Sequence, residues 1–153
     1  MIYFECKPDG LLLKVLGIPK NKMYHFGGKS LVCKQLEKHN GFKGLIDEDP
    51  YSNQPPYIQN LELIENSNEF SIKIMVDNRN NNKIIILCPK LEDWVIKATE
   101  KAGLDIRDFN LPNNEKQLHR TINVNLKKFE SLLKKLKEKS QMMKALEYHI
   151  KGD

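Results

Sequence analysis

The chain contains little that would stabilise a disulfide scaffold or a zinc site. Its three cysteines, Cys6, Cys33 and Cys88, are odd in number and lack the spacing of metal ligands. No apolar run approaches the length needed to cross a bilayer, and the N-terminus lacks the basic and apolar regions of a signal peptide. We therefore expect a cytoplasmic protein that makes no membrane contact.

Several common catalytic patterns are also missing. The chain has no glycine pattern of a P-loop or a Rossmann fold, and no spacing suggests a Ser-His-Asp or Cys-His arrangement. With 153 residues, one domain with a single core is the natural expectation.

Short apolar runs alternate with helical patterns through the first hundred residues, which predicts an α/β fold with a mainly parallel central sheet. The expected strands cover about 2–6, 23–27, 42–47, 70–76 and 83–88. The expected helices cover about 9–16, 29–40 and 90–102. The last two strands could pair as a hairpin across the polar turn between them.

The rest of the chain is less regular. Residues 49–57 are expected to form a loop, and 61–64 a short strand or a helical turn. Residues 104–124 contain Pro112 and paired asparagines and are expected to be irregular. We interpret 1–103 as the α/β core, and 104–153 as an irregular segment with a long C-terminal helix, belonging to the same domain.

Acidic residues close two of the expected strands. Glu5 ends the first, whereas Asp47 and Asp49 end the third and flank Glu48. The carboxyl ends of parallel strands form the ligand-binding edge of such sheets, so neighbouring strands would bring these carboxylates together. Because side chains alternate along a strand, Asp47 and Asp49 would point the same way and Glu48 the opposite way. Carboxylates without cysteine or histidine suit Mg²⁺ or Mn²⁺, although acids at strand ends also serve as turn formers and helix caps.

These residues carry a resemblance to the Toprim family. Residues 4–18 resemble its opening strand, Glu-Gly-x-x-Asp-like turn and helix, and residues 45–50 match its strand that ends in Asp-x-Asp. Residues 24–29 resemble the intervening strand and glycine turn, and residues 84–94 its fourth strand and Glu-x-Trp helix. The family's glycine after the first glutamate is Cys6 here, which puts the geometry of that turn in question.

The resemblance implies a Mg²⁺- or Mn²⁺-dependent nuclease with Glu5, Asp47 and Asp49 as catalytic metal ligands. It further implies that Asp9 helps to hold a second metal, and Glu92, which opens its helix after a strand end, could reach the same edge. Both positions have a structural alternative, because Asp9 could cap its helix and Glu92 suits the dipole of a first helical turn.

Two groups of lysines are candidates for phosphate contact. Lys7 lies in the first turn, and Lys29 follows a glycine pair at a helix N-terminus. A final amphipathic helix over about 125–150 carries many further lysines, among them Lys134, Lys135 and Lys139. These residues could contact nucleic acid or a partner, or they could simply be solvated.

The same helix has an apolar side that could contact a second copy of the chain or a partner protein. Its apolar residues recur at near-heptad spacing and include Leu136, Met143, Leu146 and Ile150.

Two functions therefore remain open. The first is a Toprim-type nuclease that hydrolyses phosphodiesters in DNA or RNA, and the resemblance implies that it acts as a subunit of a phage-defence system. The second is a catalytically degenerate Toprim-like subunit that binds or regulates a partner such as an ATPase. The replacement of the family glycine by Cys6 favours the second.

Overall fold

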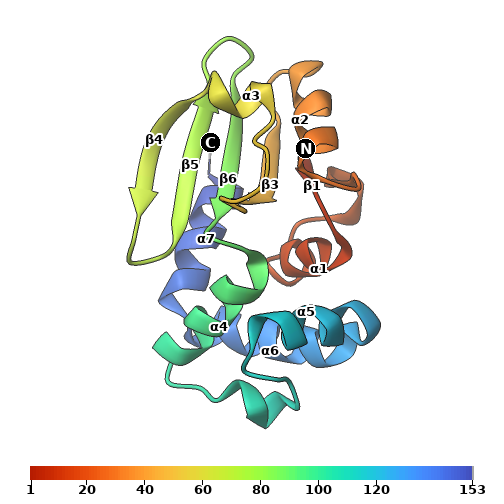
Figure 1. Cartoon of the computed structure of the whole chain (residues 1–153), viewed down its shortest axis with the longest axis vertical. Coiled ribbons are helices and arrows are strands. Elements are labelled where there is room, and N and C mark those ends of the chain that lie inside the picture. The colour runs from red at the N-terminus through yellow and green to blue at the C-terminus, as the bar shows by residue number, and fades with distance from the viewer. Residues whose placement is uncertain (153) are drawn as a thin grey trace.

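The protein forms one six-stranded sheet in the order β2-β1-β3-β6-β5-β4, as the computed structural model of residues 1–152 shows (Figure 1). The strands are β1 (Ile2–Phe4), β2 (Met23–His25), β3 (Lys43–Asp47), β4 (Glu62–Ser67), β5 (Ile72–Asp77) and β6 (Asn82–Leu87). Strands β2, β1, β3 and β6 run parallel, whereas β5 and β4 are added antiparallel at one side. The predicted α/β class and mainly parallel sheet are confirmed.

Seven α-helices are described in residues 1–152. They are α1 (Lys7–Val15), α2 (Lys29–Glu37), α3 (Pro56–Gln59), α4 (Leu91–Lys101), α5 (Glu115–Val124), α6 (Leu126–Lys139) and α7 (Gln141–Lys151). Short 3₁₀ turns occur at Lys20–Lys22 and Ile106–Phe109. None of the helices in this part of the chain is both long enough and apolar enough to span a bilayer.

Side-chain alternation along the strands builds a core on each face of the sheet. On one face Phe4 and Leu45 pack with residues of the helices α1, α4, α5, α6 and α7, including Trp94. On the other face Tyr3 and Ile46 pack with residues of α2 and α3. The sheet is therefore covered by helices on both faces.

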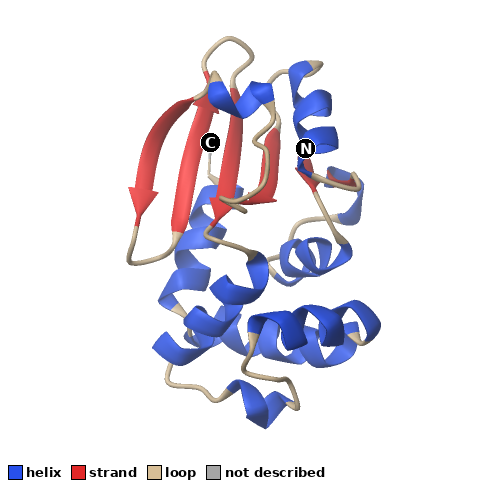
Figure 2. Cartoon of the chain, in the orientation of Figure 1, coloured by secondary structure: helices blue, strands red, loops and turns tan. Residues whose placement is uncertain are grey.

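The parallel pairing of β1 with β3 positions the acidic residues. Phe4 pairs with Leu45 in this register, so the carboxyl ends of the two strands meet. In Figure 2 the arrowheads of β3 and β6 point toward the helical layer that contains α1, α4 and α5. The expected adjacency of the two strands is confirmed, with Glu5 directly after β1 and Asp47 at the end of β3, and the β5–β6 hairpin is confirmed as well.

Residues 104–124, expected to be irregular, contain the helix α5. Leu118 and Ile122 on its inner side are fully buried, and the side-chain oxygen of Asn114 accepts a hydrogen bond from the N–H of Gln117 at 3.1 Å. A buried apolar stripe and an N-terminal cap thus outweigh the poor intrinsic helix propensity of the polar residues. A smaller correction is the helix α3, which begins within the last two residues of the loop expected over 49–57. The strand β4 settles the alternative at 61–64 in favour of a strand.

The expected single helix over 125–150 is two helices, α6 and α7, which meet at Ser140. Ser140 has extended backbone angles (φ −94°, ψ 126°), and its hydroxyl accepts a hydrogen bond from the N–H of Met143 at 3.1 Å. The bend brings both helices onto the same core. The apolar residues proposed for a partner contact are consequently 0–2% exposed: Leu136, Met143, Leu146 and Ile150. The prediction of an oligomer or partner interface through them is wrong.

Replacing Ser140 with Ala is expected to destabilise the protein by about 1 kcal/mol, because α7 loses the side-chain acceptor of its first turn. Chemical denaturation would measure the change. Ser131→Ala provides a control, since the exposed Ser131 hydroxyl donates a hydrogen bond to the carbonyl of Lys127 within its own helix and caps no helix end. Equal stability losses in the two variants would show that the cap at Ser140 is unimportant.

Candidate active site at the carboxyl edge of the sheet

Glu5 and Asp47 meet where β1 and β3 end. A side-chain oxygen of Glu5 (Oε2) accepts a hydrogen bond from the backbone N–H of Asp47 at 2.7 Å. Burial raises the pKa of Glu5, while this hydrogen bond and the charge of Lys29 act in the opposite direction. Glu5 therefore joins the two strand ends as well as contributing negative charge.

Asp47 occupies the centre of the acidic group. One of its carboxylate oxygens (Oδ1) accepts a hydrogen bond from the N–H of Leu91 at 3.0 Å, which attaches the start of α4 to β3. Burial raises the pKa of Asp47 to about 9, and the charges of Asp9, Glu5 and Glu92 contribute in the same direction. Four carboxylates thus act on one another at this edge, which is an arrangement typical of functional sites.

Asp9 is a buried residue that caps the N-terminus of α1. Its side chain is 1% exposed and accepts hydrogen bonds from the backbone N–H of Cys6 at 3.2 Å and from the Cys6 thiol at 3.1 Å. The capping alternative is confirmed, while the negative charge of Asp9 still adds to the site. Burial raises the pKa of Asp9 to about 7, against the effect of the thiol hydrogen bond.

Cys6 occupies the turn between β1 and α1. Its backbone is extended (φ −142°, ψ 165°), a conformation open to any residue, so a cysteine imposes no strain there. Burial and the neighbouring Asp9 raise the pKa of the Cys6 thiol, which keeps it protonated as a hydrogen-bond donor.

Asp49 and Glu48 diverge after β3. Glu48 forms an ion pair with Lys73 on β5, as expected for a side chain directed away from the site. Because β3 ends at Asp47, strand alternation does not position Asp49. Its backbone adopts a left-handed conformation (φ 41°), and its N–H donates to the carbonyl of Pro89 at 2.8 Å. This turn brings Asp49 to the same cavity as Asp47.

The cavity beside this edge has a volume of about 490 Å³. It is lined by Cys6, Asp47, Asp49, Lys90, Glu92, Glu115, Lys116, His119 and Arg120. Glu92 reaches the edge as proposed, is 5% exposed, and its carboxylate lies 2.8 Å from His119 Nδ1. Glu5 is connected to the cavity through its hydrogen bond to Asp47.

The wall formed by α5 was missed by the sequence interpretation because its segment was expected to be irregular. Glu115, Lys116, His119 and Arg120 all come from this helix. The available signals were Asn114 as an N-cap and the apolar pair Leu118 and Ile122 at helical spacing.

The two lysines proposed for phosphate contact lie in different surroundings. Lys29 begins α2, and its amine donates to the carbonyl of Glu48 at 2.7 Å and to the side chain of Gln54 at 3.1 Å. It therefore fastens the loop after β3 and partly offsets the charge of Glu5. Lys7 is exposed at the first position of α1.

The C-terminal lysines lie on α6, outside the lining of the acidic cavity. Lys134 lies 4.0 Å from Glu130, and Lys135 lies 3.7 Å from Glu138. Lys139 is exposed at the last position of α6. Surface ion pairs of this kind contribute little to stability.

The chemistry of the acidic group fits a hard divalent cation, because several partly buried carboxylates repel one another and supply only oxygen. The ligand geometry is not assembled: within residues 1–152, no three His, Cys, Asp or Glu side chains are arranged to hold a metal ion. Glu5 and Asp47 instead accept hydrogen bonds from backbone N–H groups. The acidic group therefore suits Mg²⁺ or Mn²⁺ in ligand type and charge, but its side chains are not arranged around a common point.

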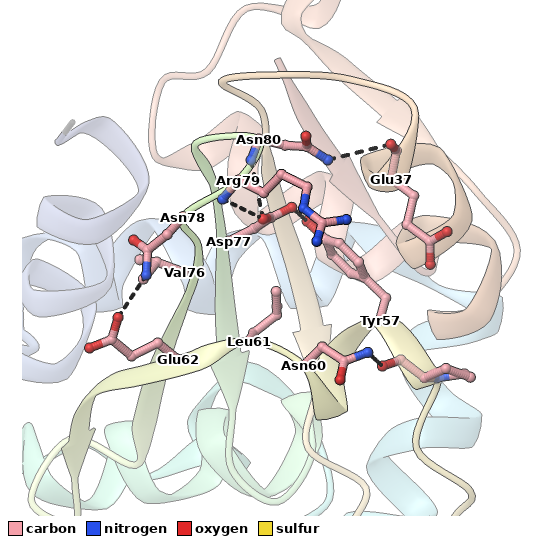
Figure 3. A pocket seen from close by; sticks show the side chains of 11 residues that line it. Glu37, Tyr57, Asn60, Leu61, Glu62, Val76, Asp77, Asn78, Arg79 and Asn80 are labelled. Atoms are coloured by element: carbon pink, nitrogen blue, oxygen red, sulfur yellow. Dashed lines mark hydrogen bonds between the residues drawn. The ribbon is translucent and has the colours of Figure 1, made fainter.

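A second cavity, of about 720 Å³, lies between α3 and the turn that joins β5 to β6 (Figure 3). Within it Asp77 accepts hydrogen bonds from the hydroxyl of Tyr57 at 2.7 Å and from the N–H groups of Arg79 and Asn80 at 3.0 and 3.1 Å. Burial alone would raise the pKa of Asp77, but these hydrogen bonds outweigh it and the pKa is lowered. The polar groups here satisfy one another, which indicates a structural role in fixing the hairpin.

Comparisons of the chain with protein-family models, with curated proteins and with solved structures find no significant match. The assignment of function consequently depends on the residues and their geometry.

Proposed function

We propose that the protein is a metal-dependent phosphodiesterase that hydrolyses nucleic acid at the carboxyl edge of β1 and β3. The observation that carries the proposal is the concentration of Glu5, Asp9, Asp47 and Glu92: burial of Asp47, together with the charges of the other three carboxylates, raises the pKa of Asp47 to about 9. Such a group is destabilising unless protons or a cation compensate it. The motif resemblance to Toprim nucleases supports the same chemistry.

Glu5, Asp47 and Asp49 would hold Mg²⁺ or Mn²⁺, with Asp9 and Glu92 contributing charge for a second ion. When bound, such an ion supplies Lewis-acid stabilisation of the phosphodiester and lowers the pKa of a coordinated water. The chain holds two of these carboxylates in place: Asp47 accepts a hydrogen bond from the N–H of Leu91, and Glu92 lies 2.8 Å from Nδ1 of His119. The resemblance to small Toprim-like proteins is the basis for extending the proposal to a subunit of a phage-defence system.

The proposal is tested by incubating the protein with single- and double-stranded DNA and with RNA, in Mg²⁺, in Mn²⁺ and in chelator. We expect cleavage that requires the metal and that Asp47→Ala removes. Cleavage that persists in chelator, or that survives in Asp47→Ala, would contradict the assignment.

A second candidate is a Toprim-like subunit that binds a partner, such as an ATPase, without cleaving nucleic acid. The specific observation in its favour is that Glu5, Asp9 and Asp47 are each engaged by N–H or S–H donors of the chain itself. If this alternative holds, the wild-type protein would lack metal-dependent cleavage on every substrate above. The partner would then have to contact exposed side chains, since Leu136, Met143, Leu146 and Ile150 are buried.

A further inference from the structure

The acidic cavity has a second wall of opposite charge. Asp47, Asp49 and Glu92 face it from the sheet edge and the start of α4, whereas Lys116 and Arg120 face it from α5. We propose that Lys116 and Arg120 bind the sugar–phosphate backbone of a nucleic acid strand that lies in this cavity. The inference rests on the proposed function and names the surface that holds its substrate.

The position of these two residues is fixed by the fold of α5. Lys116 and Arg120 are four residues apart, so they lie on the same side of the helix and about 6 Å apart along its axis. On the opposite side Leu118 and Ile122 are completely buried, and the Asn114 cap fixes the first turn. The exposed side of α5 therefore presents two cations in a defined place, where neighbouring phosphates of one strand can contact them.

Lys116 and Arg120, unlike Lys90 on the same cavity, have no ion-pair partner among residues 1–152. Lys90, on the same cavity, lies 3.6 Å from Glu115, and His119 is engaged by Glu92. Within the described residues 1–152, neither Lys116 nor Arg120 forms an ion pair or a side-chain hydrogen bond. By contrast, Lys134 and Lys135 on α6 lie beside glutamates and outside the cavity.

The acidic wall also requires cations opposite it. A phosphodiester beside Asp47 and Glu92 brings neighbouring phosphates into a region of negative potential, which repels them. Positive side chains in the same cavity offset that repulsion and hold the strand in one orientation. Lys116 and Arg120 are placed to do this. We therefore assign the phosphate contact to α5 and not to the C-terminal lysines.

The test compares Lys116→Gln/Arg120→Gln with a matched control, Lys134→Gln/Lys135→Gln, which removes the same charge from α6. Binding of a short fluorescein-labelled DNA strand is followed by fluorescence anisotropy in chelator, over a salt series. We expect the α5 variant to bind at least about tenfold more weakly at low salt. The slope of log K against log salt should decrease by about 1.4, that is, about 0.7 for each lost contact on a single strand. The control should bind within about twofold of wild type.

Three results would overturn the inference: no binding by the wild-type protein, unchanged binding by the α5 variant, or a loss confined to the α6 control. Both pairs are on the surface, so thermal melts should show that they fold as wild type. A different result would contradict the proposed function. Absence of metal-dependent cleavage, together with weakened binding by the α5 variant, would contradict the nuclease and leave the binding surface supported.

Discussion

Replacing Asp47 with Asn is expected to lower metal-dependent cleavage by at least about a thousandfold. Asn keeps the shape of the side chain and an oxygen that can accept from Leu91, but it removes the charge at the centre of the acidic group. A metal contributes several kcal/mol of transition-state stabilisation, and each 1.36 kcal/mol corresponds to about a tenfold change in rate. Initial rates of cleavage of a labelled strand in Mg²⁺ or Mn²⁺ would measure the loss.

The matched control is Glu48→Gln, which removes one negative charge from the adjacent residue. Glu48 pairs with Lys73, away from the cavity, so its replacement should leave the cleavage rate within a few-fold of wild type. If both variants lose activity equally, net charge or folding accounts for the effect. If Asp47→Asn retains wild-type rates, Asp47 has no part in the reaction.

The same substitution should stabilise the metal-free protein at neutral pH. Each unit by which the folded protein raises the pKa of Asp47 corresponds to about 1.4 kcal/mol of unfavourable free energy for the ionised form. Because Asn carries no charge, we expect Asp47→Asn to unfold at a higher denaturant concentration than wild type in chelator. Opposite changes in activity and stability are typical of residues retained for function.

The arrangement of strands was predictable because each strand carries its own signal. The apolar runs that end at Glu5 and Asp47 mark buried parallel strands, and the polar turn at 77–82 joins two β-rich segments. The rule that parallel strands bring their carboxyl ends together was then sufficient to place Glu5 beside Asp47.

The sequence led to a wrong expectation for two helical regions, α5 and the junction of α6 with α7, and the physical causes differ. In α5, the asparagines around Leu118 and Ile122 weaken the local helix signal, and burial against the neighbouring helices compensates for it. At Ser140 the apolar spacing continues unbroken, since Leu136 and Met143 are seven residues apart. A heptad pattern gives no information about a bend when the residues on both sides pack against one core.

The hydrogen bonds of the site could not be inferred from residue types. That Glu5 accepts from the N–H of Asp47 depends on the register between β1 and β3, and Asp49 reaches the cavity only through its left-handed backbone. The cationic wall depends on the packing of α5 against α4 and α6, which brings Arg120 close to residues more than seventy positions earlier in the chain. Sequence motifs identified the acids, and tertiary contacts determined what surrounds them.

The metal-free protein is expected to lose stability as the pH rises, and divalent cations should restore it. The pKa of Asp47 is raised from 3.8 to about 9 in the folded protein, and that of Asp9 to about 7. From about pH 4 up to these raised pKa values, the folded state retains protons on Asp9 and Asp47 that the unfolded state has released. The stabilisation is therefore complete below about pH 4, and it decreases through pH 7 as Asp9 ionises and toward pH 9 as Asp47 ionises.

Bound Mg²⁺ or Mn²⁺ would replace these protons, so its stabilising effect should increase with pH across the same interval. At a free concentration about 100 times the dissociation constant, one bound ion adds about 2.7 kcal/mol, which raises Tm by roughly 5–10 °C for a chain of this size. Thermal melts at pH 5 and pH 8, with Mn²⁺ and with chelator, measure both effects. Asp49→Ala should reduce the metal-dependent shift, whereas Glu48→Gln should retain it. If millimolar Mn²⁺ leaves Tm unchanged at pH 8 and Asp49→Ala behaves as wild type, these carboxylates do not form a metal site, and the acidic edge serves the fold alone.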